Sequence, residues 1–237
     1  MSRRSPLRRK LSRFRKKAAV EIFSLVIVLV VSMALVGTTY MWGMPLIIKR
    51  QDKVKIDRVY NYFNEDNANS LVYKIQEVAN SGGKETFTAD ISGLWILHNY
   101  TENSVDNNSI EFVTSSKVSS AVISDRSSIK WSSLTAGSSC PPEEGVVGVD
   151  SPLVVCARSE IFEDGFNIIY RAWSRTLKDP TVEKGYRINL IQQKDTPTTS
   201  VGRSVSISKE RSYTCTPPNL QCPEKMLIIT EIKILLV

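Results

Sequence analysis

Apolar residues dominate the first part of the chain. From Ile22 to Ile48 there is no charged residue, and Val, Ile and Leu fill most positions. As an α-helix these 27 residues rise about 40 Å, more than the roughly 30 Å hydrocarbon core of a bilayer. The pattern therefore predicts a hydrophobic helix at residues 19–48 that can span a membrane. Tyr40 and Trp42 lie near its outer end, where amphipathic aromatic side chains favour the headgroup region.

Apolar positions then recur at helical spacing from residue 49 to residue 83. Charged residues separate them, so this segment is predicted to be an amphipathic helical extension. A polar cluster at 64–69 predicts a break, and Gly82 and Gly83 predict the end of the helical region. The expected apolar faces comprise Ile47, Val54, Ile56, Val59, Tyr60 and Phe63 before the break, and Leu71, Val72, Ile75 and Val78 after it.

From residue 84 to residue 237 the apolar pattern alternates with a period of two. Polar and glycine- or proline-containing turns separate the runs, which predicts an extracellular all-β sandwich, with an immunoglobulin-like arrangement as one option. The fold class is therefore α+β. The predicted strands are Glu85–Ile91, Leu94–His98, Ser109–Thr114, Ala121–Ser124, Lys130–Leu134, Leu153–Arg158, Phe166–Ser174, Tyr186–Gln192, Val201–Ser208 and Lys225–Val237. The last run is too short and too charged for a second membrane helix, so we expect a strand.

The net charge of +7 comes from the N-terminal segment. Nine of the 31 basic residues precede Glu21, so 22 basic and 24 acidic residues remain for the rest of the chain. A polybasic segment before an apolar span follows the positive-inside rule and predicts a cytoplasmic N-terminus with the bulk of the chain outside. Because the arm has no set of interleaved aromatic residues, the sequence argues against nucleic-acid binding. We expect residues 1–18, a basic leader without apolar periodicity, to be disordered.

Four cysteines, Cys140, Cys156, Cys215 and Cys222, lie in the predicted outside portion. In an oxidising compartment an even number of cysteines indicates disulfides, and four residues allow three connectivities. Pairing of cysteines that are neighbours in the sequence closes the shortest loops, which favours Cys140 with Cys156 and Cys215 with Cys222. A zinc site is disfavoured because there is no C-x-x-C spacing and His98 is the only histidine.

No arrangement typical of catalysis, a cofactor or a metal occurs in the sequence. His98 is expected at a strand end, and no serine lies in a G-x-S-x-G turn. The carboxylate pairs Glu143/Glu144 and Glu163/Asp164 fall in predicted loops, where solvated turns are the usual explanation. Two N-glycosylation sequons stand out instead, at Asn99 and at Asn107, both in predicted turns of the outside domain.

A short motif precedes the apolar helix: Lys16-Lys17-Ala18, followed by Ala19-Val20-Glu21. An ordinary secretory signal has a core of about 7–15 apolar residues with the small-residue cleavage site after it. Here the core is longer and the small residues come first. The motif resembles the class III signal peptide of type IV pilins, particularly archaeal pilins and archaellins. The segment Tyr40–Leu46, YMWGMPL, is also similar to the residues after the helix in some archaeal pilin-like proteins.

The resemblance implies that a prepilin peptidase cuts after Ala18 and leaves Ala19 as the new N-terminus. Glu21 would be the acidic residue near the new amine that sets the register of subunits in a filament, although it is the third mature residue and bacterial pilins have their acid at the fifth. The implied protein is a non-enzymatic pilus subunit without cofactors. Its partners would be the membrane, other pilin subunits, the prepilin peptidase and the assembly machinery. Its mature form would lie on the cell surface or in an extracellular filament. The alternative is an uncleaved, single-pass surface protein whose β domain binds a ligand.

The predicted cleavage can be measured directly. Intact-mass analysis and N-terminal sequencing of protein extracted from membranes should show a chain that starts at Ala19. A protein that retains Met1 and the whole basic leader would contradict the pilin interpretation.

Overall fold

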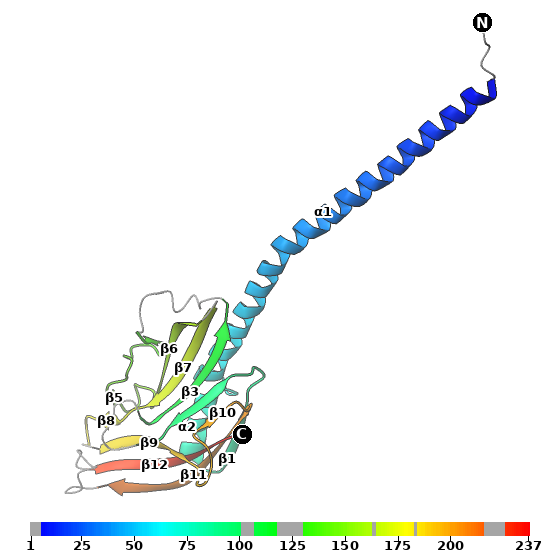
Figure 1. The fold of residues 1–237 in the computed structure, drawn as a ribbon. Coiled ribbons are helices and arrows are strands. Elements are labelled where there is room, and N and C mark those ends of the chain that lie inside the picture. The colour runs from blue at the N-terminus through cyan, green and yellow to red at the C-terminus, as the bar shows by residue number, and fades with distance from the viewer. Residues whose placement is uncertain (1–5, 101–106, 118–129, 163–164, 183, 216–225) are drawn as a thin grey trace. The chain divides into compact units, whose positions relative to one another are not determined.

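The computed structural model describes residues 6–100, 107–117, 130–162, 165–182, 184–215 and 226–237, with side chains from Glu21 onward. The chain is α+β: a long N-terminal helix with an apolar stretch is followed by a β-rich region (Figure 1). Its elements are α1 (Pro6–Phe63), α2 (Leu71–Ser81), β1 (Lys84–Thr88), β2 (Leu94–His98), β3 (Ser109–Ser116), β4 (Ser132–Ser133), β5 (Gly145–Val146), β6 (Leu153–Phe162), β7 (Gly165–Ser174), β8 (Leu177–Asp179), β9 (Lys184–Gln192), β10 (Thr199–Ser200), β11 (Ser204–Cys215) and β12 (Met226–Leu236).

The chain divides into two compact units. The first comprises Met1–Arg50, and the second, which we call the head, comprises Gln51–Val237. The head therefore begins inside helix α1 and includes nearly all of the helical extension predicted at residues 49–83. These helical residues belong to the hydrophobic core of the head rather than to a spacer, because Ile56, Phe63 and Val72 pack in the same cluster as residues of both sheets.

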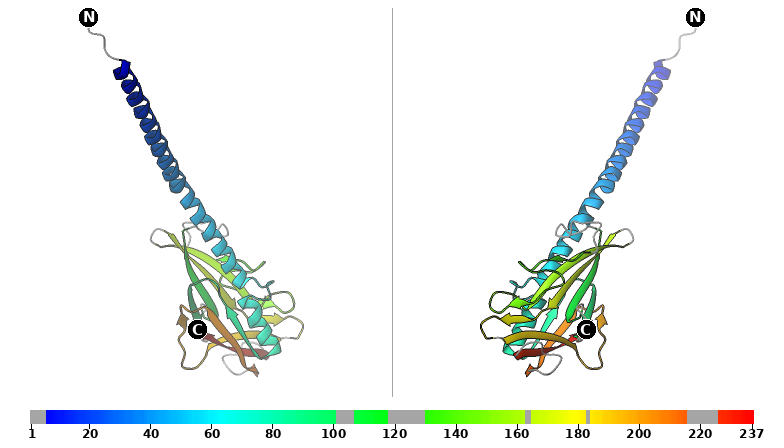
Figure 2. Two further views of the ribbon diagram at one scale, coloured as in Figure 1. Left: turned by 90° about the vertical axis from the view of Figure 1, so that its right-hand side faces the viewer. Right: turned by 90° about the vertical axis from the view of Figure 1, so that its left-hand side faces the viewer.

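The described strands of the head form two six-stranded sheets. Sheet A has the order β1-β11-β12-β9-β8-β5, and sheet B has the order β10-β2-β3-β7-β6-β4. The pairs β12/β9 and β5/β8 are parallel, and the others are antiparallel. Two views from opposite sides show the last turns of α1 and helix α2 lying against these strands (Figure 2). Helices thus take part in a core that a simple sandwich would form from sheets alone.

Tyr62, near the end of α1, connects the helix to both sheets. The ring of Tyr62 lies edge-on to Phe87 of sheet A and Phe112 of sheet B, with centroids 5.2 and 6.0 Å away. Its hydroxyl accepts hydrogen bonds from the backbone N–H groups of Asp90 and Ile91, both at 3.0 Å. It also donates to the Asp90 carboxylate. The expected apolar face of this part of α1 is confirmed at the buried residues Ile56, Val59 and Phe63. It is wrong at Ile47, Val54 and Tyr60, which are exposed, and it left out Tyr62, which is buried.

Helix α2 is delimited by local signals at both ends. Ser70 is its N-cap, and the Ser70 side chain accepts a hydrogen bond from the N–H of Tyr73 at 3.1 Å. At the other end Gly82, with φ of 81°, donates its N–H to the carbonyl of Val78. Lys209 Nζ, at 2.8 Å, donates to the carbonyl of Ala79. The buried residues of α2 include the four apolar positions expected from the sequence, Leu71, Val72, Ile75 and Val78.

The C-terminal segment is a strand inside sheet A, between β9 and β11. Ile232, Ile234 and Leu236 face the main core, as the alternation predicts. Earlier in β12 the buried residues are Leu227 and Ile229 instead, which pack with Cys215 on the other side. The expected core positions Met226 and Ile228 are only half-buried. A register shift between Lys209 and Arg211 of the neighbouring strand β11 accompanies this change.

Most predicted strands are present, and Leu94–His98 has the predicted bounds. Strands β5, β8 and β10 were not expected, because two or three residues carry no measurable period. Lys130–Leu134 contains only the two-residue strand β4. The predicted strand Ala121–Ser124 lies outside the described residues.

Phe63 offers a test of the helical core. Its side chain is 1% exposed and stacks on Tyr170, with ring centroids 5.7 Å apart. Phe63→Ala should lower the free energy of unfolding by about 3–5 kcal/mol, because it leaves a cavity between the helix and sheet B. The matched control is Tyr60→Ala, at a position 37% exposed, which should cost less than about 1 kcal/mol. Urea unfolding of the detergent-solubilised full chain, followed by tryptophan fluorescence, measures both. Equal losses would contradict the packing described.

Candidate functional site

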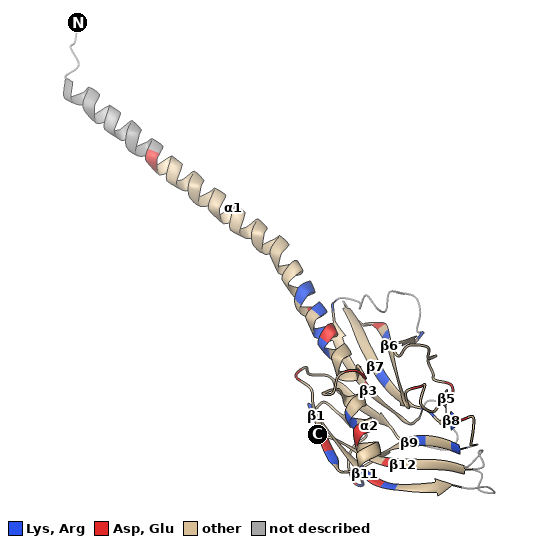
Figure 3. Cartoon of the chain, turned by 180° about the vertical axis from the view of Figure 1, so that it is seen from behind, with Lys and Arg blue, Asp and Glu red and all other residues tan. Residues whose placement is uncertain are grey.

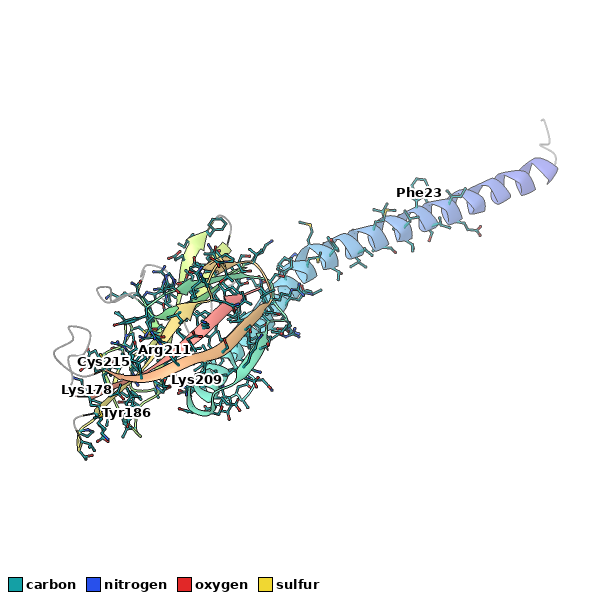
Figure 4. The ribbon with its side chains drawn as sticks, turned by 90° about the horizontal axis from the view of Figure 1, so that it is seen from below. Phe23, Lys178, Tyr186, Lys209, Arg211 and Cys215 are labelled. Carbon is teal, nitrogen blue, oxygen red and sulfur yellow. A yellow bond between two sulfur atoms is a disulfide. The ribbon has the colours of Figure 1, made fainter. Side chains whose placement is uncertain are left out.

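The uncharged stretch of α1, Ile22–Ile48, carries eighteen large apolar side chains that are exposed, from 39% for Met44 to 80% for Trp42. Figure 3 shows this stretch without blue or red, and Figure 4 shows Phe23 projecting away from the helix. Burying one such side chain stabilises by about 1.5–3 kcal/mol, so the whole stretch represents tens of kcal/mol. A typical domain is stable by only about 5–15 kcal/mol. This stretch therefore needs a non-aqueous environment or a partner.

Three side chains in this stretch donate hydroxyl hydrogen bonds to carbonyl groups of the preceding turn. Ser32 Oγ donates to the carbonyl of Val28 at 2.7 Å, and Thr39 Oγ1 donates to the carbonyl of Leu35 at 2.7 Å. Thr38 Oγ1 donates to the carbonyls of Ala34 and Leu35, both at 2.9 Å. In an apolar medium an unpaired hydroxyl is costly, so these bonds suit the helix to a bilayer or to a packed helical core. Helix α1 continues through Pro45.

Among the described residues one helix is long and apolar enough to cross a membrane, Glu21–Phe63 in α1. The length and the amino-acid composition of this helix are the two properties that fit a membrane span. Tyr40 and Trp42 are exposed near the end of the uncharged stretch, and Lys49 and Arg50 are the first charged residues after it.

The expected processing site, Lys16, Lys17, Ala18 and Ala19, falls in α1, which begins at Pro6. The prediction that the leader is disordered is therefore wrong for residues 6–18. Its side chains lie outside the described residues, so cleavage there stays a prediction. Glu21, expected to set filament register, is exposed at the start of the uncharged stretch.

Cys140 and Cys156 form a disulfide, which is the first of the two bonds expected from nearest-neighbour pairing. Cys215 is also disulfide-bonded. Its expected partner, Cys222, lies outside the described residues. The Cys140–Cys156 bond ties the chain before β5 to strand β6 of sheet B.

Both sequon asparagines lie between β2 and β3, in the turn predicted from the sequence. Asn99 is half-buried, and its Nδ2 donates to Gln192 Oε1 at 3.2 Å. Asn107 is also half-buried, next to Asn108, which has φ of 67°. Glycan attachment at either position stays a prediction. His98 ends strand β2, as expected.

A polar and aromatic cluster on the outer face of sheet B was not anticipated. Arg171 Nε donates to Glu111 Oε2 at 2.6 Å, and both residues are buried. The Arg171 guanidinium lies 4.9 Å from the ring centroid of Trp131 and 4.7 Å from that of Trp173. Arg158 covers the Trp131 ring at 4.5 Å. Trp173, Val154 and Cys156 form a small apolar cluster there, with Trp131 and Cys140 packed against it.

A signal for this cluster is present in strand β7, where Ile168, Ile169 and Tyr170 are consecutive large apolar residues. Such a run indicates a strand buried on both faces. Because the chain from Trp131 to Cys140 covers the outer face, Arg171 is enclosed there instead of facing water.

Electrostatics keep Glu111 ionised inside this cluster. Burial by itself would raise the pKa of the Glu111 carboxyl, but His98 and Arg171 outweigh burial and hold this pKa below its usual range. His98 Nε2 lies 3.6 Å from Glu111 Oε2, the same carboxylate oxygen that accepts the hydrogen bond from Arg171. The arrangement is that of a structural ion pair supported by cation–π contacts.

The head also contains an open cleft of about 410 Å³. It lies where α2 ends and sheet A continues, and most of its lining is apolar, including Leu177, Tyr186, Ile188 and Ile228. Arg187 is the one charged residue among the described residues that line it. No group of three or more His, Cys, Asp or Glu side chains placed to hold a metal ion occurs within the described residues.

We compared the chain with protein-family models, with curated proteins and with solved structures. None of these three comparisons found a match.

The buried ion pair gives a testable prediction. Arg171→Met should cost about 3–5 kcal/mol of unfolding free energy, because it leaves the Glu111 carboxylate buried and unpaired. The double variant Glu111→Gln/Arg171→Met should lose less than the sum of the two single losses, since it removes both charges. Urea unfolding of the four proteins provides this cycle, and additive losses would mean that the pair is not coupled.

The same pair predicts the direction of a pH effect. The pKa of the Glu111 carboxyl is lower in the folded state than in the unfolded state, where it is about 4.3. The ionised carboxyl therefore stabilises the folded state at pH values above about 4.3, and this contribution is lost as the pH falls through the folded-state pKa. Unfolding free energy should therefore fall as pH decreases below about 5. Glu111→Gln should remove part of this dependence, whereas Glu77→Gln, at an exposed position of α2, should not.

Proposed function

We propose that the chain is a non-enzymatic structural subunit of a type IV pilus-like surface filament. A prepilin peptidase removes the leader after Ala18, and the apolar helix then passes from the bilayer into the filament core. The β head faces solvent and serves adhesion or surface contact. The observation that carries this proposal is the exposed, uncharged stretch Ile22–Ile48, which follows the small-residue motif instead of preceding it.

Several further features support the proposal. After cleavage the amine of Ala19 lies close in sequence to Glu21, so the carboxylate of one subunit can meet the ammonium of a neighbour and set the register, although such a buried pair adds little net stability. Removing the leader also takes away the positive block and leaves a nearly neutral chain. Within the head, an immunoglobulin-like arrangement stays a prediction, and the helical part of the core is a departure from a sandwich of two sheets alone.

A second candidate function is an uncleaved, single-pass surface protein whose head binds a small ligand or a partner. The apolar cleft of about 410 Å³ in the head favours it, since clefts of this size hold small molecules. In this case the helix stays in the bilayer permanently and the leader stays attached.

Replacing the residue before the expected cut separates the two functions. Ala18→Trp should block processing, because the peptidase site needs a small residue, and it should abolish surface filaments. The matched control Ala18→Gly keeps a small residue and should be processed and assembled normally. Intact mass reports cleavage, and electron microscopy with a head-specific antibody reports filaments. Normal filaments from an unprocessed Ala18→Trp protein would disprove the proposed mechanism, and an intact leader in the wild type would favour the anchored protein.

A further inference from the structure

We propose that Lys49 and Arg50 bind the phosphate groups of anionic phospholipids in the leaflet opposite the basic leader. This inference rests on the proposed insertion of the helix into a membrane. Both side chains are exposed, and they are the first charges after 27 uncharged residues.

The length of the uncharged stretch places the backbone of these two residues just outside the headgroup layer. The stretch rises about 40 Å, which exceeds the hydrocarbon core by roughly 10 Å. Trp42 is 80% exposed, and an exposed tryptophan at this end of a span lies at the membrane interface. Lys49 follows seven residues later, about 10 Å further along the helix axis.

The direction of helical side chains brings the two charges back toward the lipid. In an α-helix each Cα–Cβ bond tilts toward the N-terminus, and the N-terminus of this helix points into the membrane. The long stems of Lys49 and Arg50 therefore carry their charges toward the headgroup layer, which is roughly 5–7 Å thick on each side. Trp42 and Lys49 are two turns apart and share one face of the helix, so Trp42 reports on lipids that Lys49 recruits.

The positive-inside rule does not account for these two cations, because it favours basic residues on the side of the leader. Two charged residues slightly further along α1, by contrast, already have partners within the head. Asp52 accepts a hydrogen bond from the N–H of Lys117 at 2.7 Å, and Lys55 Nζ donates to the carbonyl of Ser115 at 2.7 Å. An anionic phospholipid headgroup carries the net negative charge that complements Lys49 and Arg50, whereas a zwitterionic headgroup carries none.

Quenching of Trp42 by brominated lipid tests the proposal. The full chain is reconstituted into phosphatidylcholine vesicles that all contain the same small fraction of phosphatidylglycerol. An equal fraction of the lipid is brominated in each sample, and the brominated lipid is either phosphatidylglycerol or phosphatidylcholine. The quenching of the Trp42→Phe variant is subtracted to remove the other tryptophans. Brominated phosphatidylglycerol should quench Trp42 with an apparent association roughly fivefold stronger than brominated phosphatidylcholine, and high salt should reduce this preference.

Two variants complete the test. Lys49→Gln/Arg50→Gln should abolish the preference, whereas Lys84→Gln/Lys194→Gln, which removes the same charge from exposed positions of the head, should retain it. Equal quenching by both lipids, or a preference that survives Lys49→Gln/Arg50→Gln, would overturn the lipid site while membrane insertion stands. Absence of quenching by either lipid would overturn insertion itself and with it the proposed function. Inorganic phosphate at constant ionic strength should not displace the lipid.

Discussion

Water cannot solvate about seven turns of helix that are apolar on every side, and this constraint governs the rest of the molecule. The side chains of Ile22–Ile48 are exposed in the isolated chain, and their burial is worth more than the stability of a typical domain. A bilayer buries these side chains around a single helix, and in a bundle the helices of neighbouring copies bury them against one another. Hydrogen bonds from Ser32, Thr38 and Thr39 to the preceding turn make the helix compatible with either environment.

The same helix meets a different requirement beyond Arg50. There the buried apolar residues lie on one face of the helix. Tyr62 and Phe63 pack against aromatic residues of the two sheets. The last turns of α1, after Arg50, therefore belong to the folded head.

The candidate sites differ in how far local sequence could reveal them. The uncharged stretch, and the position of the two sequon asparagines between β2 and β3, follow from local composition. The Glu111–Arg171 pair could not be found in this way, because its partners come from strands about 60 residues apart and its burial depends on the covering chain before Cys140. The cleft beside Ile228 could not be found in this way either, because residues of α2, of the chain between β5 and β6, and of β8, β9 and β12 line it.

The sequence alone determined the membrane-length helix, the break before α2 and most of the strands, since charge, capping residues and a period of two act over a few neighbouring positions. It also indicated a Cys140–Cys156 bond, through short chain closure. Tertiary structure decided that the segment after Arg50 belongs to the core of the head, that β12 pairs in parallel with β9, and that Leu227 and Ile229 replace Met226 and Ile228 as buried residues. The physical reason is that burial depends on what packs against each face, and residues distant in sequence supply that packing.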